Sequence, residues 1–181
     1  MSEAEKGAIN GSDEEDGQTD QPVAPIVFHG QFMKDLSFEI PGAPGIFDIL
    51  QKQAPDIPLS IDCHVRGLTN NRFEITIRIH IEATIQSETA FILEITYAAV
   101  VSIGEIPPAH LHPVLLIEVP RQLFPFVRQI VADTTSSGGF PPLMLQVIDF
   151  KDLYERKYAA DASGWNDATQ TLPNRTETSS E

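Results

Sequence analysis

The chain has 181 residues, with 26 acidic and 12 basic side chains and a formal net charge of −14 at pH 7. This length is typical of one domain, and the negative charge repels phosphate backbones, which excludes nucleic acid as an expected partner. No basic and apolar leader opens the chain and no apolar run of about 18 residues follows, so we expect a cytoplasmic protein without membrane insertion.

The two ends differ in composition from the middle. Residues 1–25 hold seven acidic side chains and one basic side chain, and residues 159–181 are small, polar and acidic apart from Trp165. Neither end can bury enough apolar surface to offset the entropy of ordering. We therefore expect a disordered acidic arm over residues 1–25, a folded domain over residues 26–158, and a flexible tail over residues 159–181.

Four segments of the middle part alternate apolar and polar residues, which is the period of a strand with one buried face. The first is rich in Phe and Ile and precedes a loop of Pro and Gly at residues 41–45. Residues 67–71 and 86–88 have the composition of hairpin turns. The four segments cover residues 27–38, 57–65, 73–85 and 91–103. We expect them to form one antiparallel sheet, with the single cysteine, Cys63, buried as a small hydrophobe.

Helix is expected after Pro107-Pro108. Residues 110–119 predict a first helical piece. Pro120 fits either a kink or the first turn of a new helix, where its missing N–H does no harm. That helix repeats apolar side chains and one threonine at steps of three and four: Leu123, Phe124, Val127, Ile130, Val131 and Thr134.

Gly138-Gly139 ends the long helix, because a left-handed cap favours glycine. Residues 140–147 are expected to be extended, and Asp149 to cap a short helix that reaches Lys157. Strands first and helices after indicate an α+β fold, a four-stranded antiparallel sheet followed by a long helix and a short C-terminal helix.

Patterns that carry chemistry are scarce in this sequence. His110 and His112 have no acid or cysteine beside them at zinc spacing. Neither a G-x-x-x-x-G-K-[ST] phosphate loop nor a G-x-G-x-x-G motif occurs. We therefore expect no metal, no cofactor and no catalytic residue.

Two blocks of the chain resemble the SecB family of bacterial protein-export chaperones. The first is FMKDLSFE at residues 32–39, followed by Pro41-Gly42-Ala43-Pro44 and Phe47. The second begins with LFPF at residues 123–126, continues through GFPPL at residues 139–143 and ends at Phe150. With the ETAF turn at residues 88–91, the resemblance covers about residues 26–158.

The resemblance implies a homotetramer, a dimer of dimers in which sheets pair across one interface and long helices pack at the other. The helix residues expected at that second interface are Phe124, Val127, Ile130 and Val131. The resemblance also implies an ATP-independent holdase that keeps preproteins unfolded and passes them to the translocation ATPase SecA.

A holdase binds many unfolded segments without reading their sequence, so its site should be an apolar groove that accepts varied side chains. The resemblance places the groove walls at residues 41–54 and in the run after Gly139. The candidate groove residues are Phe38, Phe47, Phe140, Leu143, Met144, Leu145 and Phe150. The competing interpretation is that these side chains are ordinary core or oligomer contacts.

Asp35 and Glu39 match family positions that contact SecA, and the resemblance adds Ile85 and Glu88 at the turn before ETAF. Ser87 stands where the family has an acid. A catalytic carboxylate pair is excluded, because four strand residues span roughly 13 Å, beyond the ~5–9.5 Å that such catalysis uses. A plain solvated strand face is the other interpretation of Asp35 and Glu39.

Two alternative functions stay open. A SecB-like chaperone can serve one antitoxin instead of general export, with the same groove physics. A thioesterase-like α+β enzyme, in which a curved sheet wraps a helix around a small-molecule pocket, is the contrary class. The apolar faces of the predicted strands argue against this enzyme, since they hold aliphatic residues and Cys63 but no acid–base pair.

Overall fold

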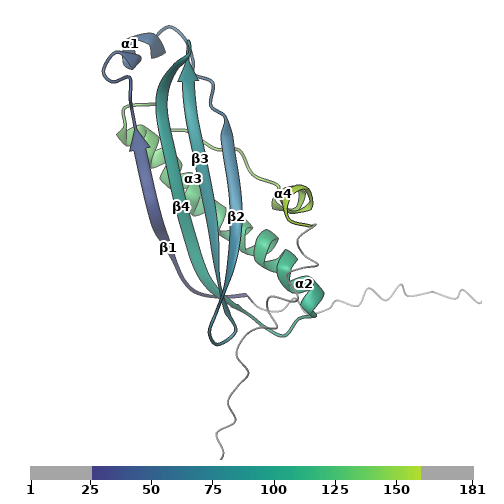
Figure 1. Ribbon diagram of the computed structural model, residues 1–181. Helices are drawn as coiled ribbons and strands as arrows, with labels where there is room; N and C mark the ends of the chain where they lie inside the picture. The colour runs from purple at the N-terminus through teal and green to yellow at the C-terminus, as the bar shows by residue number, and fades with distance from the viewer. Residues whose placement is uncertain (1–25, 160–181) are drawn as a thin grey trace, which may run out of the picture.

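The structure is a computed structural model that describes residues 26–159. The expected acidic arm and all but the first residue of the expected tail lie outside this range. Four antiparallel strands form one sheet in the order β1-β4-β3-β2, with one long helical segment behind it (Figure 1). The strands are β1 (Ile26–Glu39), β2 (Leu59–Leu68), β3 (Arg72–Ile85) and β4 (Glu88–Ile103). The predicted sheet is confirmed, each observed strand lying within three residues of its predicted bounds.

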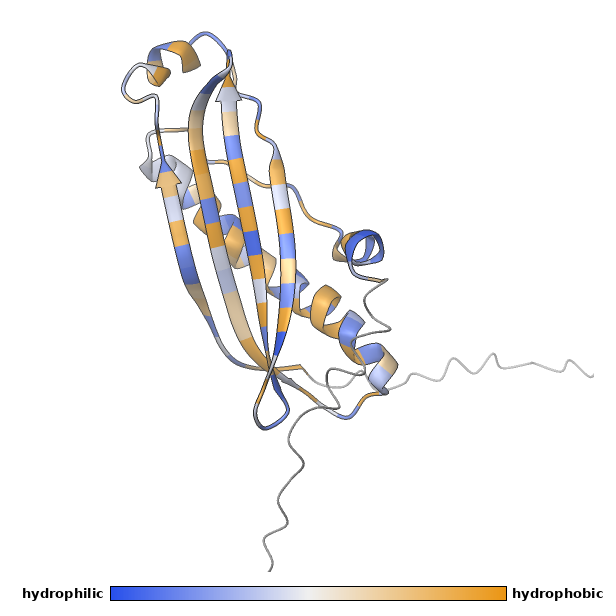
Figure 2. Ribbon diagram, viewed as in Figure 1, coloured by the Kyte–Doolittle hydropathy of each residue, from blue (hydrophilic) through white to orange (hydrophobic). Residues whose placement is uncertain are grey.

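Period-two alternation divides the sheet into two faces. Along β3, Phe73 and every second residue up to Ile85 are buried, and the intervening residues belong to the opposite face. Figure 2 shows the matching alternation of hydrophobic and hydrophilic residues along the strands. Cys63 on β2 lies on the buried face, as predicted. The opposite face, called the outer face below, is covered by no helix among residues 26–159 (Figure 1).

Edge strand β1 alternates less regularly because it carries two bulges. Its register with β4 shifts between Phe28 and Gly30 and again between Met33 and Asp35. A bulge adds one residue to one strand and re-aims the side chains that follow it. Phe32 therefore lies opposite Ala98 on the outer face, whereas Leu36 lies opposite Ile95 on the buried face.

The long helical segment has three parts: α2 (Pro108–Pro113), the π-helical η1 (Val114–Glu118) and α3 (Val119–Ser137). In η1 the N–H of Val119 donates to the carbonyl of Val114, five residues earlier. Pro120 follows directly, and a proline ring clashes with the carbonyl four residues before it, so a wider turn removes the conflict. Of the two alternatives for Pro120, the first turn of a new helix is the observed one.

Two glycines end α3 as predicted. Gly139 has φ of +87°, and the N–H of Phe140 donates to the carbonyl of Thr135 at 3.1 Å, which closes a Schellman motif. Residues 141–149 form no regular element, and α4 (Phe150–Lys157) follows. The Asp149 side chain accepts from the N–H groups of Lys151 and Asp152, so the predicted N-cap is confirmed.

One element was not predicted. The loop after β1 contains a short helix, α1 (Ile46–Leu50), whose Ile46 is buried. None of the helices between residues 26 and 159 is both long and apolar enough to cross a membrane.

Candidate functional site

An apolar cavity of about 550 Å³ opens at the end of the sheet that carries α1. The segment after α1 forms one wall and the Pro-rich segment after α3 forms the other. Phe91 and Phe140 also line it, and the full lining is Leu50, Gln51, Lys52, Gln53, Ala54, Pro55, Ile57, Phe91, Phe140, Pro141, Pro142 and Leu143. The two regions expected as groove walls thus lie around a single cavity.

Four phenylalanine rings pack together beside this cavity. Phe140 is central, with ring centroids 4.9 Å from Phe91, 5.3 Å from Phe47 and 6.2 Å from Phe38. Such tilted and edge-to-face pairs are the favoured aromatic arrangements. The cluster therefore fixes β1, α1, β4 and the segment after α3 relative to one another.

A buried hydroxyl holds the Pro-rich wall on α3. Thr135 is fully buried, and its Oγ1 donates to the carbonyl of Val131 at 2.9 Å. The same oxygen accepts from the N–H of Leu143 at 3.0 Å. The wall is therefore anchored by a hydrogen bond to the helix as well as by apolar contact.

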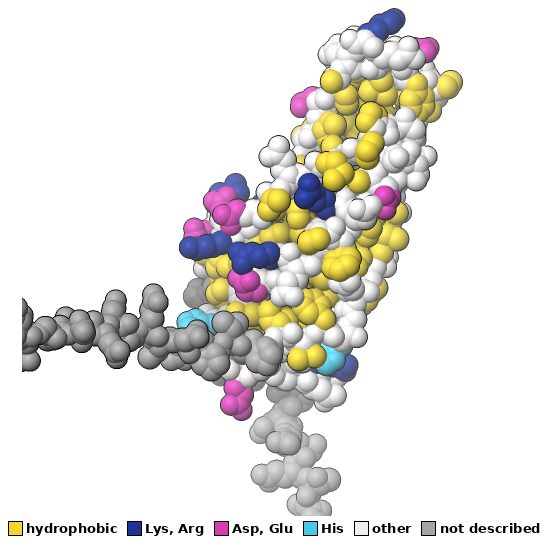
Figure 3. All heavy atoms as spheres, turned by 180° about the vertical axis from the view of Figure 1, so that it is seen from behind, with side chains coloured by type: hydrophobic (Ala, Val, Ile, Leu, Met, Phe, Trp, Pro, Cys, Tyr) yellow, Lys and Arg dark blue, Asp and Glu magenta, His cyan; other side chains and the backbone are white. Residues whose placement is uncertain are grey.

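A second hollow of about 310 Å³ lies between α3 and residues 144–150. Its lining is Arg121, Phe124, Pro125, Arg128, Gln129, Met144, Val147, Ile148 and Phe150. Val147 is 81% exposed, and Figure 3 shows hydrophobic side chains spread along this helix side of the molecule. Together with the first cavity, it makes an apolar surface that follows the segment from Phe140 to Phe150.

The candidate groove residues fall into three groups. Phe140 and Leu143 line the first cavity, and Met144 and Phe150 line the second. Phe38 and Phe47 belong to the phenylalanine cluster without lining either hollow. Leu145 is buried in the core and lines neither hollow, so its place in the groove stays a prediction.

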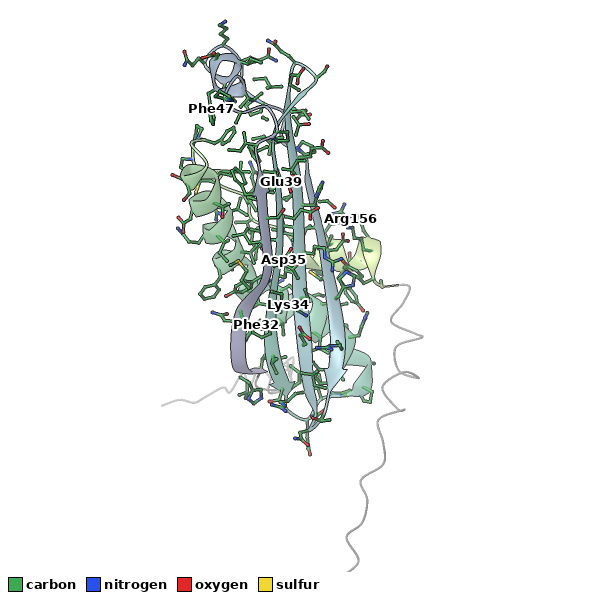
Figure 4. All side chains as sticks on the ribbon, turned by 60° about the vertical axis from the view of Figure 1, so that its left-hand side comes forward. Phe32, Lys34, Asp35, Glu39, Phe47 and Arg156 are labelled. Carbon is green, nitrogen blue, oxygen red and sulfur yellow. The ribbon has the colours of Figure 1, made fainter. Side chains whose placement is uncertain are left out.

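The predicted acidic residues lie on the outer face of the sheet or at its end. Asp35 is opposite Thr96 and Glu39 is opposite Ile92, so both carboxylates share the outer face of β1 (Figure 4). Glu88 is exposed at the start of β4. Ile85 is only 2% exposed, because its position in the alternation of β3 directs it into the core. This burial leaves Ile85 little surface for a docked partner, and its docking role stays a prediction.

The interface residues predicted on the long helix differ in their exposure, and their role in an assembly stays a prediction. Phe124, Val127 and Val131 are buried within the chain, since they form the stripe by which α3 packs on the sheet. Ile130 is half-buried. The large apolar side chain that α3 leaves exposed is Phe126, at 48%.

Helix α4 is fastened to the free edge of β2. The N–H of Cys63 donates to the Tyr158 hydroxyl at 2.8 Å, and Lys157 Nζ donates to the carbonyl of Ile61 at 2.8 Å and to Asp62 at 2.7 Å. Burial, with a smaller contribution from Asp62, raises the pKa of Cys63 from 9.0 to about 12. The thiol is therefore a structural group and is not poised for chemistry.

The histidines give no metal site. His112 is buried with its Nδ1 3.0 Å from the Tyr154 hydroxyl, a contact between α2 and α4. Burial raises the pKa of Tyr154 above its usual value. Across residues 26–159, no three His, Cys, Asp or Glu side chains lie close enough together to hold a metal ion.

Two residues of the site were missed from the sequence. Phe91 was read only as part of a strand face, yet it lines the cavity. Thr135 anchors a wall, although the three- and four-residue repeat had selected Thr134, and a hydroxyl that bonds to a distant segment leaves no sequence signal.

Fold and site together define a small α+β binding protein with an apolar groove. The profile of the SecB family, described as preprotein translocase subunit SecB, matches residues 18–161. Curated relatives carry the name protein-export protein SecB. One from Rhodospirillum rubrum is 46% identical over 77% of this chain and 86% of its own length. One from Paramagnetospirillum magneticum is 46% identical over 80% of this chain and 93% of its own length.

The chain belongs to the SecB family and is a protein-export chaperone. A solved structure has the same fold: a SecB-like chaperone of Mycobacterium tuberculosis in complex with a peptide from an antitoxin. Its TM-score is 0.58 at 19% identity, with 68% of this chain and 90% of that chain covered. At this identity, the structural likeness shows a shared fold and does not by itself show a shared function.

Proposed function

We propose that the protein is an ATP-independent holdase of the cytoplasm that binds extended apolar segments of unfolded preproteins in the groove between Phe140 and Phe150. The observation that carries this proposal is the cavity of about 550 Å³ with Phe91 and Phe140 in its wall. An open apolar hollow without a metal cluster among the described residues suits binding by burial of varied side chains. No catalytic step is part of the proposal.

A charge placed in the cavity tests this groove. Leu50→Glu and Leu143→Glu each put a carboxylate on a wall, so we expect weaker suppression of aggregation of an unfolded, signal-bearing precursor. Leu68→Glu is the matched control, because Leu68 is partly exposed at the far end of β2 and outside the core cluster. If both wall variants protect the precursor as well as the control does, clients bind elsewhere.

Measuring the protection of an antitoxin beside that of exported precursors separates general export from the antitoxin alternative. Relatives at 46% identity are named protein-export proteins, whereas the antitoxin-bound neighbour is 19% identical. We therefore favour general preproteins as clients. Stronger protection of an antitoxin than of exported precursors would reverse that choice.

We propose a homotetramer, a dimer of dimers, and the two sheet edges support one of its interfaces. The β2 edge is partly covered by Lys157 and Tyr158. The β1 edge has no strand beside it within residues 26–159, and it exposes Phe32, Met33 and Leu36. An open apolar edge strand favours pairing with another chain. Native mass spectrometry should give about four times the single-chain mass of 20.0 kDa.

We also propose that SecA docks on the outer face and edge of the sheet through Asp35, Glu39 and Glu88. These three carboxylates are exposed, and no ion pair engages them within residues 26–159. Free carboxylates suit a cationic partner surface. Asp35→Asn should weaken binding of SecA and lessen the salt dependence of its association, measured by calorimetry and stopped-flow.

A further inference from the structure

The second bulge of β1 brings two opposite charges to one face of the sheet. Lys34 is the residue added between Met33 and Asp35. Asp35 projects from the outer face, and Lys34 reaches Glu74, which lies on the same face of β3. The side chains of Lys34 and Asp35, neighbours in sequence on β1 (Figure 4), therefore both lie on the outer face.

Lys34 forms its ion pair with Glu74 and not with Asp35. Lys34 Nζ lies 2.6 Å from Glu74 Oε1, and Arg66 Nε on β2 lies 2.9 Å from Glu74 Oε2, which Arg66 Nη2 also contacts. Glu74 is only 4% exposed although it belongs to the outer face. The hydrogen bond from Lys34 lowers the pKa of Glu74 more than burial raises it, and Arg66 lowers it further. One carboxylate thus links β1, β3 and β2.

Strand β4 separates the strands that carry Glu74 and Lys34. On its outer face, Val100 lies opposite Glu74, and Ala98 lies opposite Phe32 of β1 and Thr76 of β3 and is fully buried. The ion pair between Lys34 and Glu74 therefore crosses the outer face of β4.

We propose that Glu74 is a positioning residue for docking: it sequesters Lys34 and thereby leaves the Asp35 carboxylate free to meet a cationic partner surface. This inference depends on the docking function proposed above. An ammonium released beside Asp35 would pair with it and lower the negative charge that the partner meets. Neither Lys34 nor Glu74 needs to touch the partner.

The test measures the affinity of purified SecA for the full-length chain. Glu74→Gln keeps the size of the side chain but releases Lys34, so we expect affinity to fall by about two- to fivefold, the range of an exposed ion pair. Lys34→Met added to Glu74→Gln should restore most of the affinity, because the competing cation is gone. Glu155→Gln is the matched control, since Glu155 is an exposed carboxylate that pairs with Lys151 on α4, away from the outer face of the sheet.

The results distinguish a failure of the docking proposal from a failure of the positioning role of Glu74. If Asp35→Asn binds SecA as tightly as the parent, the docking proposal itself fails. If Asp35→Asn weakens binding but Glu74→Gln does not, or Lys34→Met gives no rescue, the positioning role is wrong. An equal loss in Glu155→Gln would assign the effect to net charge and also overturn the positioning role. Suppression of precursor aggregation should be the same in all these variants, which checks that the chain is folded.

Discussion

The single cysteine lies where β2 meets α4, and its environment is set by burial. Cys63 is enclosed by the sheet on one side, and its backbone N–H is held by Tyr158. The alternation of β2 was enough to predict burial, because a strand places every second side chain on the same face. The contact with Tyr158 spans 95 residues and could not be read from a local pattern.

We predict that the native thiol resists labelling. The pKa of Cys63 is raised from 9.0 to about 12, so little thiolate forms at neutral pH, and its contribution to stability is complete below pH 9. That contribution is lost as the pH rises from 9 towards 12. Thiol-reagent kinetics at pH 8 should be slow in the native chain and fast in urea. Equal rates in both would contradict a buried thiol.

Thr135 is the second residue whose role depends on a distant partner. Thr135→Val keeps the shape but removes the acceptor for the Leu143 N–H, so we expect a loss of about 1–3 kcal/mol in the free energy of unfolding. Urea unfolding measures it. Thr134→Val, at the half-exposed neighbouring position, should change stability by less than about 0.5 kcal/mol. Equal losses in the two variants would show that the hydrogen bond is unimportant.

At the scale of elements, the strands and helix ends followed local rules, and the departures have identifiable causes. The π-helical turn η1 accommodates Pro120, and the bulges of β1 re-aim its side chains. Helix α1 escaped prediction because it has five residues, too few for a three- and four-residue repeat to show. The hairpin after Ile85 has positive φ at Gln86 and Ser87, which are not the residues that such a turn usually carries.

The end of α3 gives a prediction for an element. Gly139→Ala forces a side chain into the left-handed region, which costs about 1–2 kcal/mol. A Cβ on Gly138 would overlap the ring of Phe38, so Gly138→Ala should displace that ring and disturb the phenylalanine cluster. Gly67→Ala meets no atom within 4 Å and serves as the control. Thermal unfolding ranks the three variants by their Tm. A Gly139→Ala variant with the Tm of the parent would contradict the Schellman cap.

At the scale of the whole molecule, the two sheet edges and the exposed side of α3 are unequal surfaces. One edge is fastened to α4, the other exposes apolar side chains, and Phe126 stands out from the helix. Phe124, Val127 and Val131 are mostly buried against the chain's own core, whereas Phe126 is the large apolar side chain that α3 leaves exposed.

We predict that two single variants dissociate the assembly at different interfaces. Met33→Lys charges the open β1 edge, and charged edge strands resist pairing. Phe126→Glu charges the exposed side of α3. Each should halve the native mass, and the double variant should give single chains. Val147→Glu, another exposed position, is the control. A parent protein of 20.0 kDa native mass would contradict the tetramer outright.

The sequence by itself determined the order of strands and helices, the buried face of β3, the caps at Gly139 and Asp149, and the family. These features depend on residues close together in the chain, where alternation, capping and motif spacing act directly. Only the tertiary structure decided that Leu145 is core, that Phe91 and Thr135 belong to the site, and that Lys34 is held by Glu74. Those outcomes depend on which distant segments meet, because burial and ion pairing are properties of neighbours in space.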